Sequence, residues 1–491
     1  MWYLNIQKKP GSSLMKQIYE QIRFGILKGE LKAGQKLSST REMSQVLNIS
    51  RNTIMGAYEM LIAEGYLTSI QGAGFFVAQG AEFSDSPSKI SDYQMTAFPS
   101  GKLEEGTIGF HSGTPALDLF PRSKWNKLAS RTFNEATVSA LGYDDPQGRP
   151  ELRNILTSYL KKVRGIHCHP DQIIITTGAK QGLSLIAKCL LRSGSEVWVE
   201  EPSNSNVGKI FSYHTAHIVP IPVDYQGIRT ELFPTGGCPA LIFVTPAHQF
   251  PLGGVLPIQR RLELIRFAQA SGCYIVEDDY DSEFCYLGLP ISSLQELDNH
   301  KVIYIGTFSK ILFPSLRLGY MVLPLPLVEQ CREWKRLGDH HSNSLNQLTL
   351  MRFIESGELE RHIARMKKIY HQRRDILIAG LKEYFPGQVK VMGEMAGMHV
   401  VAEFSGVVFT SGLLKEIEKS GVNVIPVEEH AMIKGNHQNQ IILGYAHLNP
   451  ADIEKGLARL KGALRSSPGH EEENIYSVPP NRRSDYFWQS G

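Results

Sequence analysis

The feature that most restricts the fold is a short apolar run that ends in a cluster of reactive side chains. Residues 302–305 (VIYI) are apolar, end at a glycine and predict a buried strand. The following residues hold one amine, Lys310, with hydroxyl groups before it at Thr307 and Ser309 and a fixed cation after it at Arg317. This pattern favours a Schiff base between Lys310 and an aldehyde cofactor with a phosphate, which Arg317 and Thr307 would bind.

Two upstream segments supply the other groups that pyridoxal phosphate requires. Residues 273–276 (CYIV) predict a strand that runs into acidic residues. Asp278 is suited to the ring nitrogen, because a protonated pyridinium makes the ring an electron sink. Tyr280, two residues on, points to the same side and is suited to the ring hydroxyl. In a strand, turn and helix pattern further back, the helix start at Gly178 and Ala179 offers N–H groups and a positive dipole end to a phosphate.

The first 80 residues predict three helices followed by a hairpin. An S-x-x-E capping box at residues 39–42 begins the second helix, with Met43, Val46 and Leu47 facing inward. Ser50 caps the third helix and leaves three polar residues facing outward near its start, where a helix-turn-helix protein reads the major groove. These residues are Arg51, Asn52 and Thr53.

A glycine-rich turn at residues 71–74 (QGAG), which includes Gly72, predicts a wing between two short strands. Residues 1–80 carry nine Lys and Arg against five Glu, whereas the net charge of all 491 residues is only +3. A basic first segment attached to a neutral remainder is compatible with double-stranded DNA as the partner. The alternative is a small helical domain with a polar face, in which the helix-turn-helix pattern arises by chance.

Six motifs in a fixed order resemble the type I fold of pyridoxal-phosphate aminotransferases. They are TTGAKQ, EPSNSN, TPAHQFPLGG, EDDYDSEF, GTFSK and PSLRLGY. With the N-terminal segment, residues 10–465 resemble the MocR/GabR branch of the GntR regulators. The resemblance implies an α/β chain in which a winged helix-turn-helix precedes a fold-type I aminotransferase-like domain with a large mixed or parallel-sheet lobe and a small C-terminal α+β lobe. It carries Lys310, Asp278, Tyr280 and Arg317 over as site residues, and the GntR motif implies DNA contacts by Arg41 and Arg51.

The expected domains are a winged helix-turn-helix over 1–80, a linker over 81–106, an aminotransferase-like domain over 107–465 and a flexible tail over 466–491. The resemblance implies a head-to-tail homodimer in which the DNA-binding domain of one chain lies over the large domain of the other. We expect a cytoplasmic protein, since no apolar run approaches a membrane span and the six cysteines are scattered without a CxxC pair. No metal site is predicted.

The sequence departs from this family at positions that bind the ring and the substrate. Asn204 stands where the family usually has an aromatic residue that stacks on the cofactor ring, and Asn206 stands where amino-acid sensors often have arginine. Residues 441–445 (IILGY) also lack the arginine that amino-acid-binding relatives can have there. The usual bidentate grip on a carboxylate is therefore missing.

Two loop positions are weaker candidates for cofactor contacts, and each has an alternative. Tyr143 corresponds to a tyrosine that reaches the phosphate of the neighbouring subunit, or is a loop residue packed on the surface. His248 or Gln249 is suited to the ring oxygen of the cofactor, although loop histidines more often face solvent.

These features predict a transcription regulator that binds operator DNA through the winged helix and senses a small-molecule effector at the Schiff base of Lys310. The effector would be an amino compound or pyridoxal phosphate itself. The alternative is an active aminotransferase with an accessory DNA-binding domain, and the missing arginine and aromatic residue argue against it.

Overall fold

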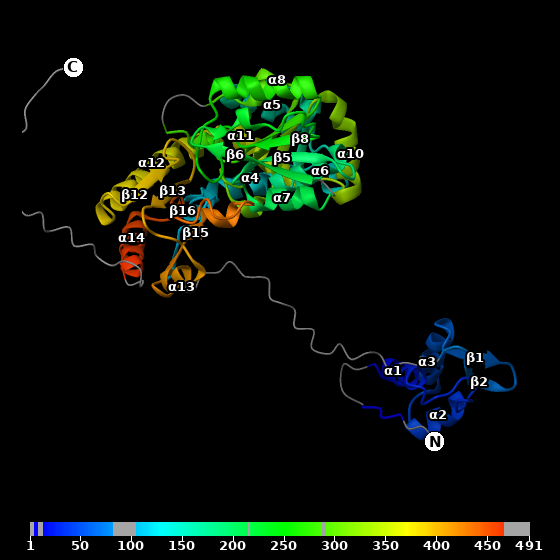
Figure 1. Cartoon of the computed structure of the whole chain (residues 1–491). Helices are drawn as coiled ribbons and strands as arrows, with labels where there is room; N and C mark the ends of the chain where they lie inside the picture. The colour runs from blue at the N-terminus through cyan, green and yellow to red at the C-terminus, as the bar shows by residue number, and fades with distance from the viewer. Residues whose placement is uncertain (1–3, 8–12, 82–104, 215–216, 287–290, 466–491) are drawn as a thin grey trace, which may run out of the picture. The chain divides into compact units, whose positions relative to one another are not determined.

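The described residues form two compact units. A computed structural model describes residues 4–7, 13–81, 105–214, 217–286 and 291–465. The units divide between residues 101 and 102, and each is described by itself (Figure 1). Most of the predicted linker over 81–106 and the predicted tail over 466–491 lie outside the described residues.

The first unit has the predicted three helices and hairpin. Its elements are α1 (Leu14–Leu27), α2 (Thr40–Leu47), α3 (Arg51–Ala63), β1 (Leu67–Ile70) and β2 (Gly74–Val77). The two strands pair antiparallel, with Leu67 opposite Val77. Apolar residues at helical spacing close the core between α1 and α3, and they include Ile18, Ile22, Ile54, Tyr58 and Leu61, all fully buried.

The start of α2 follows the sequence pattern, but one of its apolar residues does not. The Ser39 hydroxyl accepts from Glu42 N–H at 3.2 Å, and the Glu42 carboxylate accepts from Ser39 N–H at 3.0 Å. Met43 and Leu47 pack against the core one turn apart, whereas Val46 is 69% exposed. The prediction that Val46 faces inward is wrong, because α2 contacts the core along a narrow stripe and Val46 lies beside it.

The second unit contains a large sheet of mixed direction. Its strand order is β4, β11, β10, β9, β8, β5, β6, β7. The central strands β10, β9, β8, β5 and β6 are parallel, and β11 is antiparallel to both of its neighbours. The bounds are β4 (Ile173–Thr176), β5 (Glu196–Glu201), β6 (His217–Asp224), β7 (Gly227–Ile228), β8 (Leu241–Val244), β9 (Tyr274–Asp279), β10 (Val302–Thr307) and β11 (Gly319–Val322).

Helices cover both faces of this sheet because its strands are apolar on both sides. One face packs against α5 (Pro150–Arg164), α8 (Ile258–Ser271) and α11 (Ser344–Glu355), and α4 (Arg122–Glu135) packs on α11. The opposite face packs against α6 (Ala179–Leu190), α7 (Ser205–Ser212) and α10 (Leu325–Asp339). On β5, Trp198 joins the α8 cluster, whereas Val197 and Val199 join the α6 cluster. Figure 1 shows α8 and α6 on opposite sides of these strands.

A smaller lobe completes the second unit. Its antiparallel sheet has the order β12 (Val389–Met392), β13 (His399–Phe404), β16 (Gln440–Gly444) and β15 (Ile425–Pro426). The helices α12 (Glu358–Tyr384), α13 (Ser411–Lys419) and α14 (Pro450–Arg465) pack with it around one apolar cluster. The start of the unit also joins this lobe, because β3 (Ile108–Gly109) pairs with β14 (Val422–Asn423).

None of the helices that the structure describes is long and apolar enough to cross a membrane.

The capping box predicts a measurable contribution to the stability of the first unit. We expect Ser39→Ala to lower the free energy of unfolding by about 1 kcal/mol, because Glu42 N–H loses its acceptor. Urea unfolding of the full chain, together with amide hydrogen exchange of the α2 residues, measures this loss of stability. Ser69→Ala at an exposed position of β1 is the matched control and should change little. Equal stability of the two variants would contradict the role of the cap.

Candidate functional site

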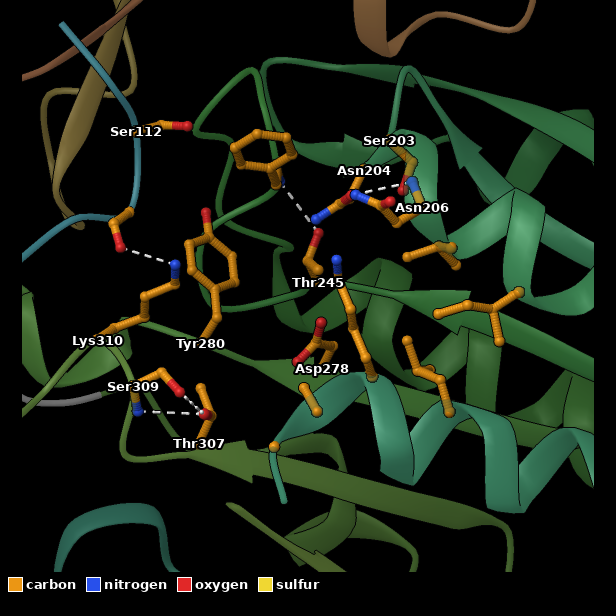
Figure 2. A pocket seen from close by; sticks show the side chains of 18 of the residues that line it. Ser112, Ser203, Asn204, Asn206, Thr245, Asp278, Tyr280, Thr307, Ser309 and Lys310 are labelled. Atoms are coloured by element: carbon orange, nitrogen blue, oxygen red, sulfur yellow. Dashed lines mark hydrogen bonds between the residues drawn. The ribbon is translucent and has the colours of Figure 1, made fainter. Parts of the chain in front are cut away.

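The candidate site is a cavity of about 370 Å³ in the second unit, next to the carboxyl ends of the parallel strands β8, β9 and β10. Ligands of open α/β sheets bind at this edge. Eight residues predicted from the sequence line the cavity, and Figure 2 shows several of them around it. They are Gly178, Ala179, Asn204, Asp278, Tyr280, Thr307, Lys310 and Arg317.

Lys310 enters the cavity from the turn that follows β10. Its Nζ donates a hydrogen bond to the carbonyl oxygen of Gly113 at 2.7 Å. Burial lowers the pKa of Lys310, while Asp281 and Asp278 act in the opposite direction. A lowered pKa increases the fraction of neutral amine, which is the form that attacks a carbonyl carbon.

Three consecutive acidic residues end β9, and their hydrogen bonds distinguish them. Glu277 accepts from the backbone N–H groups of Leu294 at 3.0 Å and Gln295 at 3.1 Å. Asp279 pairs with Arg164. By contrast, Oδ1 of Asp278 is buried without a hydrogen-bond partner. Asp278 is therefore the acid of this run that has an acceptor free for a ligand.

The position of Asp278 follows from the geometry of the strand. Successive side chains of a strand alternate, so Asp278 points to the opposite face from Glu277 and Asp279. Burial raises the pKa of Asp278 to about 7, Asp279 adds to this rise, and Lys310 opposes it. A protonated ring nitrogen that donates to Asp278 would satisfy the free oxygen and stabilise the carboxylate form.

The part of the cavity lining around the start of α6 has groups that could bind an anion. No side chain caps the first turn of α6, which begins after Gly178. Gly178 has a φ of 126°, and a side chain there would meet the guanidinium of Arg317 at 3.4 Å. The Thr307 hydroxyl donates to Ser309 Oγ at 3.1 Å, and both residues line the cavity. A helix start, an arginine and two hydroxyls fit a phosphate group, and with Asp278 and Lys310 they fit pyridoxal phosphate.

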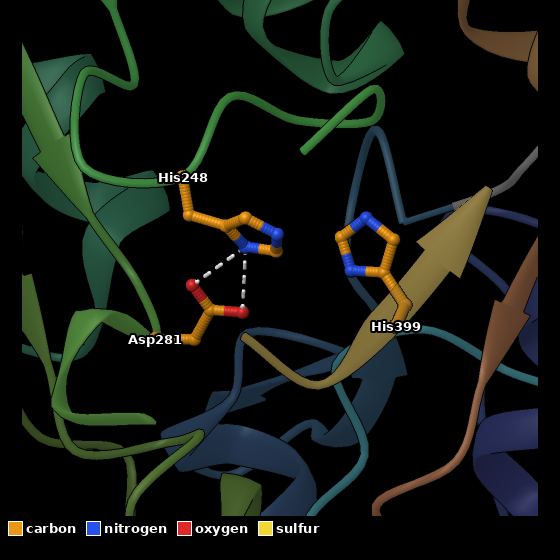
Figure 3. A group of neighbouring side chains, drawn as sticks. All are labelled: His248, Asp281 and His399. Carbon is orange, nitrogen blue, oxygen red and sulfur yellow. Dashed lines mark hydrogen bonds and ion pairs between the residues drawn. The ribbon is translucent and has the colours of Figure 1, made fainter. Parts of the chain in front are cut away.

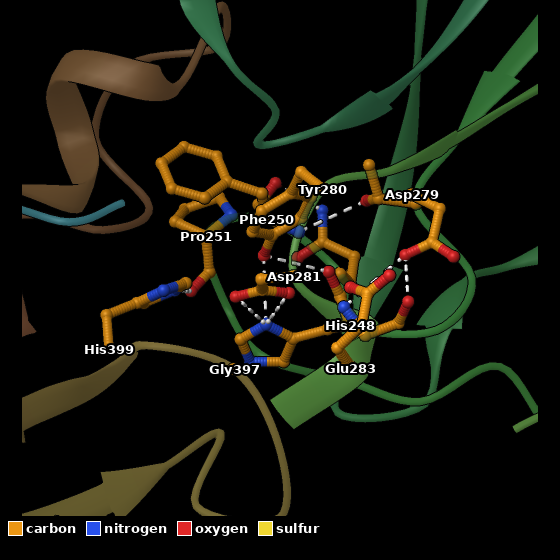
Figure 4. A network of polar contacts seen from close by, with 12 residues as sticks. His248, Phe250, Pro251, Asp279, Tyr280, Asp281, Glu283, Gly397 and His399 are labelled. Carbon is orange, nitrogen blue, oxygen red and sulfur yellow. Dashed lines mark hydrogen bonds and ion pairs between the residues drawn. The ribbon is translucent and has the colours of Figure 1, made fainter. Parts of the chain in front are cut away.

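His248 supports Tyr280 from behind and does not line the cavity. Its Nδ1 lies 2.9 Å from the Tyr280 hydroxyl and 3.1 Å from Oδ1 of Asp281 (Figure 4). Its side chain is buried, so it does not face solvent, and Gly397 packs directly on the ring. The contact of His248 with the ring oxygen of a cofactor stays a prediction.

His399 lies beside His248 and Asp281. These three side chains form a buried group whose potential metal-ligand atoms lie within 4.8 Å of one another (Figure 3). His399 Nε2 bonds to the carbonyl oxygen of Pro251 at 2.9 Å. Nδ1 of His248 bonds to Asp281 and Nε2 of His399 bonds to the backbone, whereas Nε2 of His248 is buried without a hydrogen-bond partner.

The other predicted residues are placed as follows. Asn204 lines the cavity and caps α7, where its Oδ1 accepts from Asn206 N–H at 3.1 Å. Gln249 is fully buried, and its amide donates to the carbonyl oxygen of Pro202 at 2.9 Å. Tyr143 lies outside the cavity, is 86% exposed and contacts the His340 ring edge to face. Its predicted reach to a neighbouring subunit stays a prediction.

Sequence reasoning missed several residues of the cavity. Gly113 supplies the acceptor for Lys310, and Ser203, His399 and His430 line the wall. Ser203 belongs to the EPSNSN motif, so the neighbouring residues of that motif could have indicated that it lines the cavity. The two histidines come from the small lobe, and nothing in their local sequence indicates that they line the same cavity as Lys310.

The candidate DNA-binding residues lie on the first unit. Ser50 caps α3 by accepting from Thr53 N–H at 3.2 Å, and its hydroxyl also pairs with the Thr53 hydroxyl at 2.7 Å. Arg51 is exposed, and its Nε donates to the Thr40 hydroxyl at 3.3 Å. Three further candidates are exposed: Arg41, Asn52 and Gly72. Gly72 lies at the tip of the hairpin and has a φ of 78°.

Comparison with known families agrees with this division. Residues 14–77 match the family of bacterial regulatory proteins described as the gntR family. Residues 105–460 match the aminotransferase class I and II family.

Two curated proteins are similar over most of the chain. The chain is 35% identical over 459 residues to the uncharacterized HTH-type transcriptional regulator YdeL of Bacillus subtilis, covering 92% of this chain and 97% of that protein. It is 34% identical over 461 residues to the probable rhizopine catabolism regulatory protein MocR of Rhizobium meliloti, covering 91% and 93%. Among solved structures, a kynurenine aminotransferase of Pyrococcus horikoshii superposes with a TM-score of 0.68 at 29% identity, covering 73% of this chain and 91% of that one.

The side chain of Asp278 predicts a pH dependence of the stability of the cofactor-free protein. In the folded state the carboxyl group of Asp278 stays protonated up to about pH 7, whereas in the unfolded chain it loses its proton at about pH 3.9. Stability is therefore lost as the pH rises from about 4 to about 7. We expect Asp278→Asn to reduce the loss between pH 5 and pH 8 by about 1 to 2 kcal/mol. Urea unfolding at both pH values measures it, with Asp118→Asn at an exposed carboxylate as the control. An unchanged loss in Asp278→Asn would refute the assignment.

Arg51 predicts an effect on DNA binding. If Arg51 reads a base, Arg51→Ala should weaken operator binding by about 1 to 3 kcal/mol; if it holds a phosphate, the salt slope should fall by about one. Fluorescence anisotropy over a salt series distinguishes the two. Lys28→Ala, at an exposed lysine just beyond α1, is the control for general loss of charge. No change in either quantity would remove Arg51 from the interface.

Proposed function

The chain belongs to the MocR-type branch of the GntR transcription regulators, and we propose that it holds pyridoxal phosphate on Lys310 and senses a small molecule there. DNA binding follows from the gntR domain over residues 14–77. The observation that carries the cofactor proposal is the buried oxygen of Asp278 that has no partner in a cavity shared with Lys310.

Each end of the cavity has a role toward the cofactor. Asp278 would keep the ring nitrogen protonated, and Arg317 with the start of α6 would hold the phosphate. Lys310 would hold the aldehyde carbon. When bound, pyridoxal phosphate supplies an electron-withdrawing ring and an aldehyde carbon that accepts primary amines. Tyr280, supported by His248, would place its hydroxyl at the ring oxygen.

The effector would act by binding one arrangement of the regulator better than another. A ligand shifts an equilibrium only by its difference in affinity between the two states. The cavity is lined by residues of both lobes, since Lys310 follows β10 of the large sheet and His399 begins β13 of the small one. A ligand that contacts both lobes would therefore favour one lobe arrangement. A head-to-tail homodimer would pass this change to the DNA-binding units of both chains.

An active aminotransferase remains the second candidate, and the cavity favours regulation over it. Ile442, within the segment where amino-acid-binding relatives can carry arginine, is fully buried in an apolar cluster with Val401 and Val427. A substrate carboxylate would have no fixed cation there. Sensing of pyridoxal phosphate itself is also consistent with the apolar cluster around Ile442. Operator affinity measured with the cofactor alone would distinguish this function from amine sensing.

The cofactor assignment predicts a spectroscopic result. Purified protein with added pyridoxal phosphate should show the visible absorption band of the lysine-bound cofactor, and Lys310→Ala should lack it, because the amine is gone. Lys161→Ala, at an exposed lysine of α5, is the control and should keep the band. A band of equal strength in Lys310→Ala would mean that another lysine holds the cofactor. No band in any variant would make the domain a scaffold without cofactor.

A further inference from the structure

The cavity lining holds three basic side chains, and one of them, Arg317, lies beside the start of α6 at the proposed phosphate end. Among the described lining residues, the lysines and arginines are Lys180, Lys310 and Arg317. Arg317 adjoins Gly178, and Lys180 belongs to the first turn of α6. The ammonium group of Lys180 adds to the lowering of the pKa of Lys310, which is due mainly to burial. The phosphate of the proposed cofactor would use Arg317.

The wall formed with the small lobe is apolar where a carboxylate would need a partner. Phe250 and Ile425 line the cavity and pack against the buried cluster that contains Ile442. Ile425 and Ile442 are opposite each other on β15 and β16. A carboxylate placed against this wall would lose its hydration without gaining a countercharge, which is strongly unfavourable.

Two buried polar atoms on this side have no hydrogen-bond partner. They are Oγ of Ser203 and Nδ1 of His430. The residues are neighbours, because Ser203 N–H donates to the carbonyl oxygen of His430 at 3.3 Å. Both line the cavity, and the side chain of Ser203, a residue only 5% exposed, lies with Asn204 and Asn206 on the side away from Lys310 (Figure 2). Buried polar groups are normally paired, so two free atoms on neighbouring residues of the cavity lining indicate a ligand.

The charge of His430 decides what kind of group these atoms can bind. Burial, together with the nearby Lys434, lowers the pKa of His430 to about 4. The ring is therefore neutral near pH 7 and offers a hydrogen bond without a positive charge. A hydroxyl on the ligand can donate to one of the two atoms and accept from the other.

We propose that the effector is a primary amine whose other polar groups are uncharged, and that Ser203 and His430 together bind a hydroxyl of it. The inference rests on the proposed function, because the amine end requires pyridoxal phosphate on Lys310. It excludes ordinary α-amino acids as preferred effectors, since their carboxylate would meet the apolar wall around Ile442.

Matched pairs of ligands test the class of effector. Ethanolamine and L-serine differ by one carboxylate, as do 3-amino-1-propanol and L-homoserine. Titration calorimetry on the full chain loaded with pyridoxal phosphate measures their affinities, and operator binding is the second readout. We expect each amine to bind at least about tenfold more tightly than its amino acid. An amino acid that binds as tightly as its amine, or amines that give no binding, would overturn the proposal.

Variants test the two residues separately. Ser203→Ala and His430→Ala should each weaken the binding of 3-amino-1-propanol by about tenfold. The affinity for propylamine, which lacks the hydroxyl, should stay nearly unchanged. Ser212→Ala on α7 is the matched control, because its hydroxyl bonds to the Lys209 carbonyl oxygen outside the cavity. Unchanged affinity for the amino alcohol in both variants would exclude this role.

Lys180→Gln tests the rival possibility that Lys180 holds an effector carboxylate. We expect this variant to keep the preference for amines over amino acids. A selective loss of amino-acid affinity would overturn the proposal. Failure of the cofactor assignment is distinguishable, because the visible band would then be missing before any amine is added. An intact band together with tighter binding of serine than ethanolamine would reject the effector class alone.

Discussion

The buried ion pair between Arg164 and Asp279 positions the end of β9, and the candidate site depends on it. Nε of Arg164 lies 2.8 Å from Oδ2 of Asp279, and both side chains are at most 4% exposed. The Tyr304 hydroxyl also donates to this carboxylate at 2.6 Å. With Asp279 held on one face of the sheet, strand geometry sends Asp278 to the other face, beside Lys310. A buried polar atom without a partner is costly, so the free oxygen of Asp278 is expected only where a ligand completes it.

In the proposed function, the small lobe would supply what distinguishes this cavity from an amino-acid site. Its sheet brings His399 and the apolar cluster of Ile442 to the wall, and a neighbouring turn brings His430. The pKa of each of the two histidines is lowered to about 4, mainly by burial. The lobe therefore contributes hydrogen-bonding groups without positive charge. In the proposed function, effector selection would depend on these groups together with Ser203 of the large lobe.

Much of the fold and part of the site could be predicted because their signals are local. The strands before Lys310 and Asp278 were visible as continuous apolar runs, although β10 and β9 extend further, to Thr307 and Asp279. The capping box at Ser39 was visible because it involves residues three apart. Burial of individual side chains was less predictable. Val46 is exposed and His248 is buried, since both depend on which element packs against them.

By itself, the sequence determined the order of the elements, the helix start before the phosphate end, and the reactive side chains at the strand ends. These depend on apolar runs, glycines and spacings within a few residues. Only the tertiary structure decided that Asp278 is the acid without a partner, that His248 stands behind Tyr280, and that Ser203 meets His430. The physical reason is that these relations join residues far apart in the chain, and packing between lobes decides which polar atoms are satisfied within the protein and which remain free for a ligand.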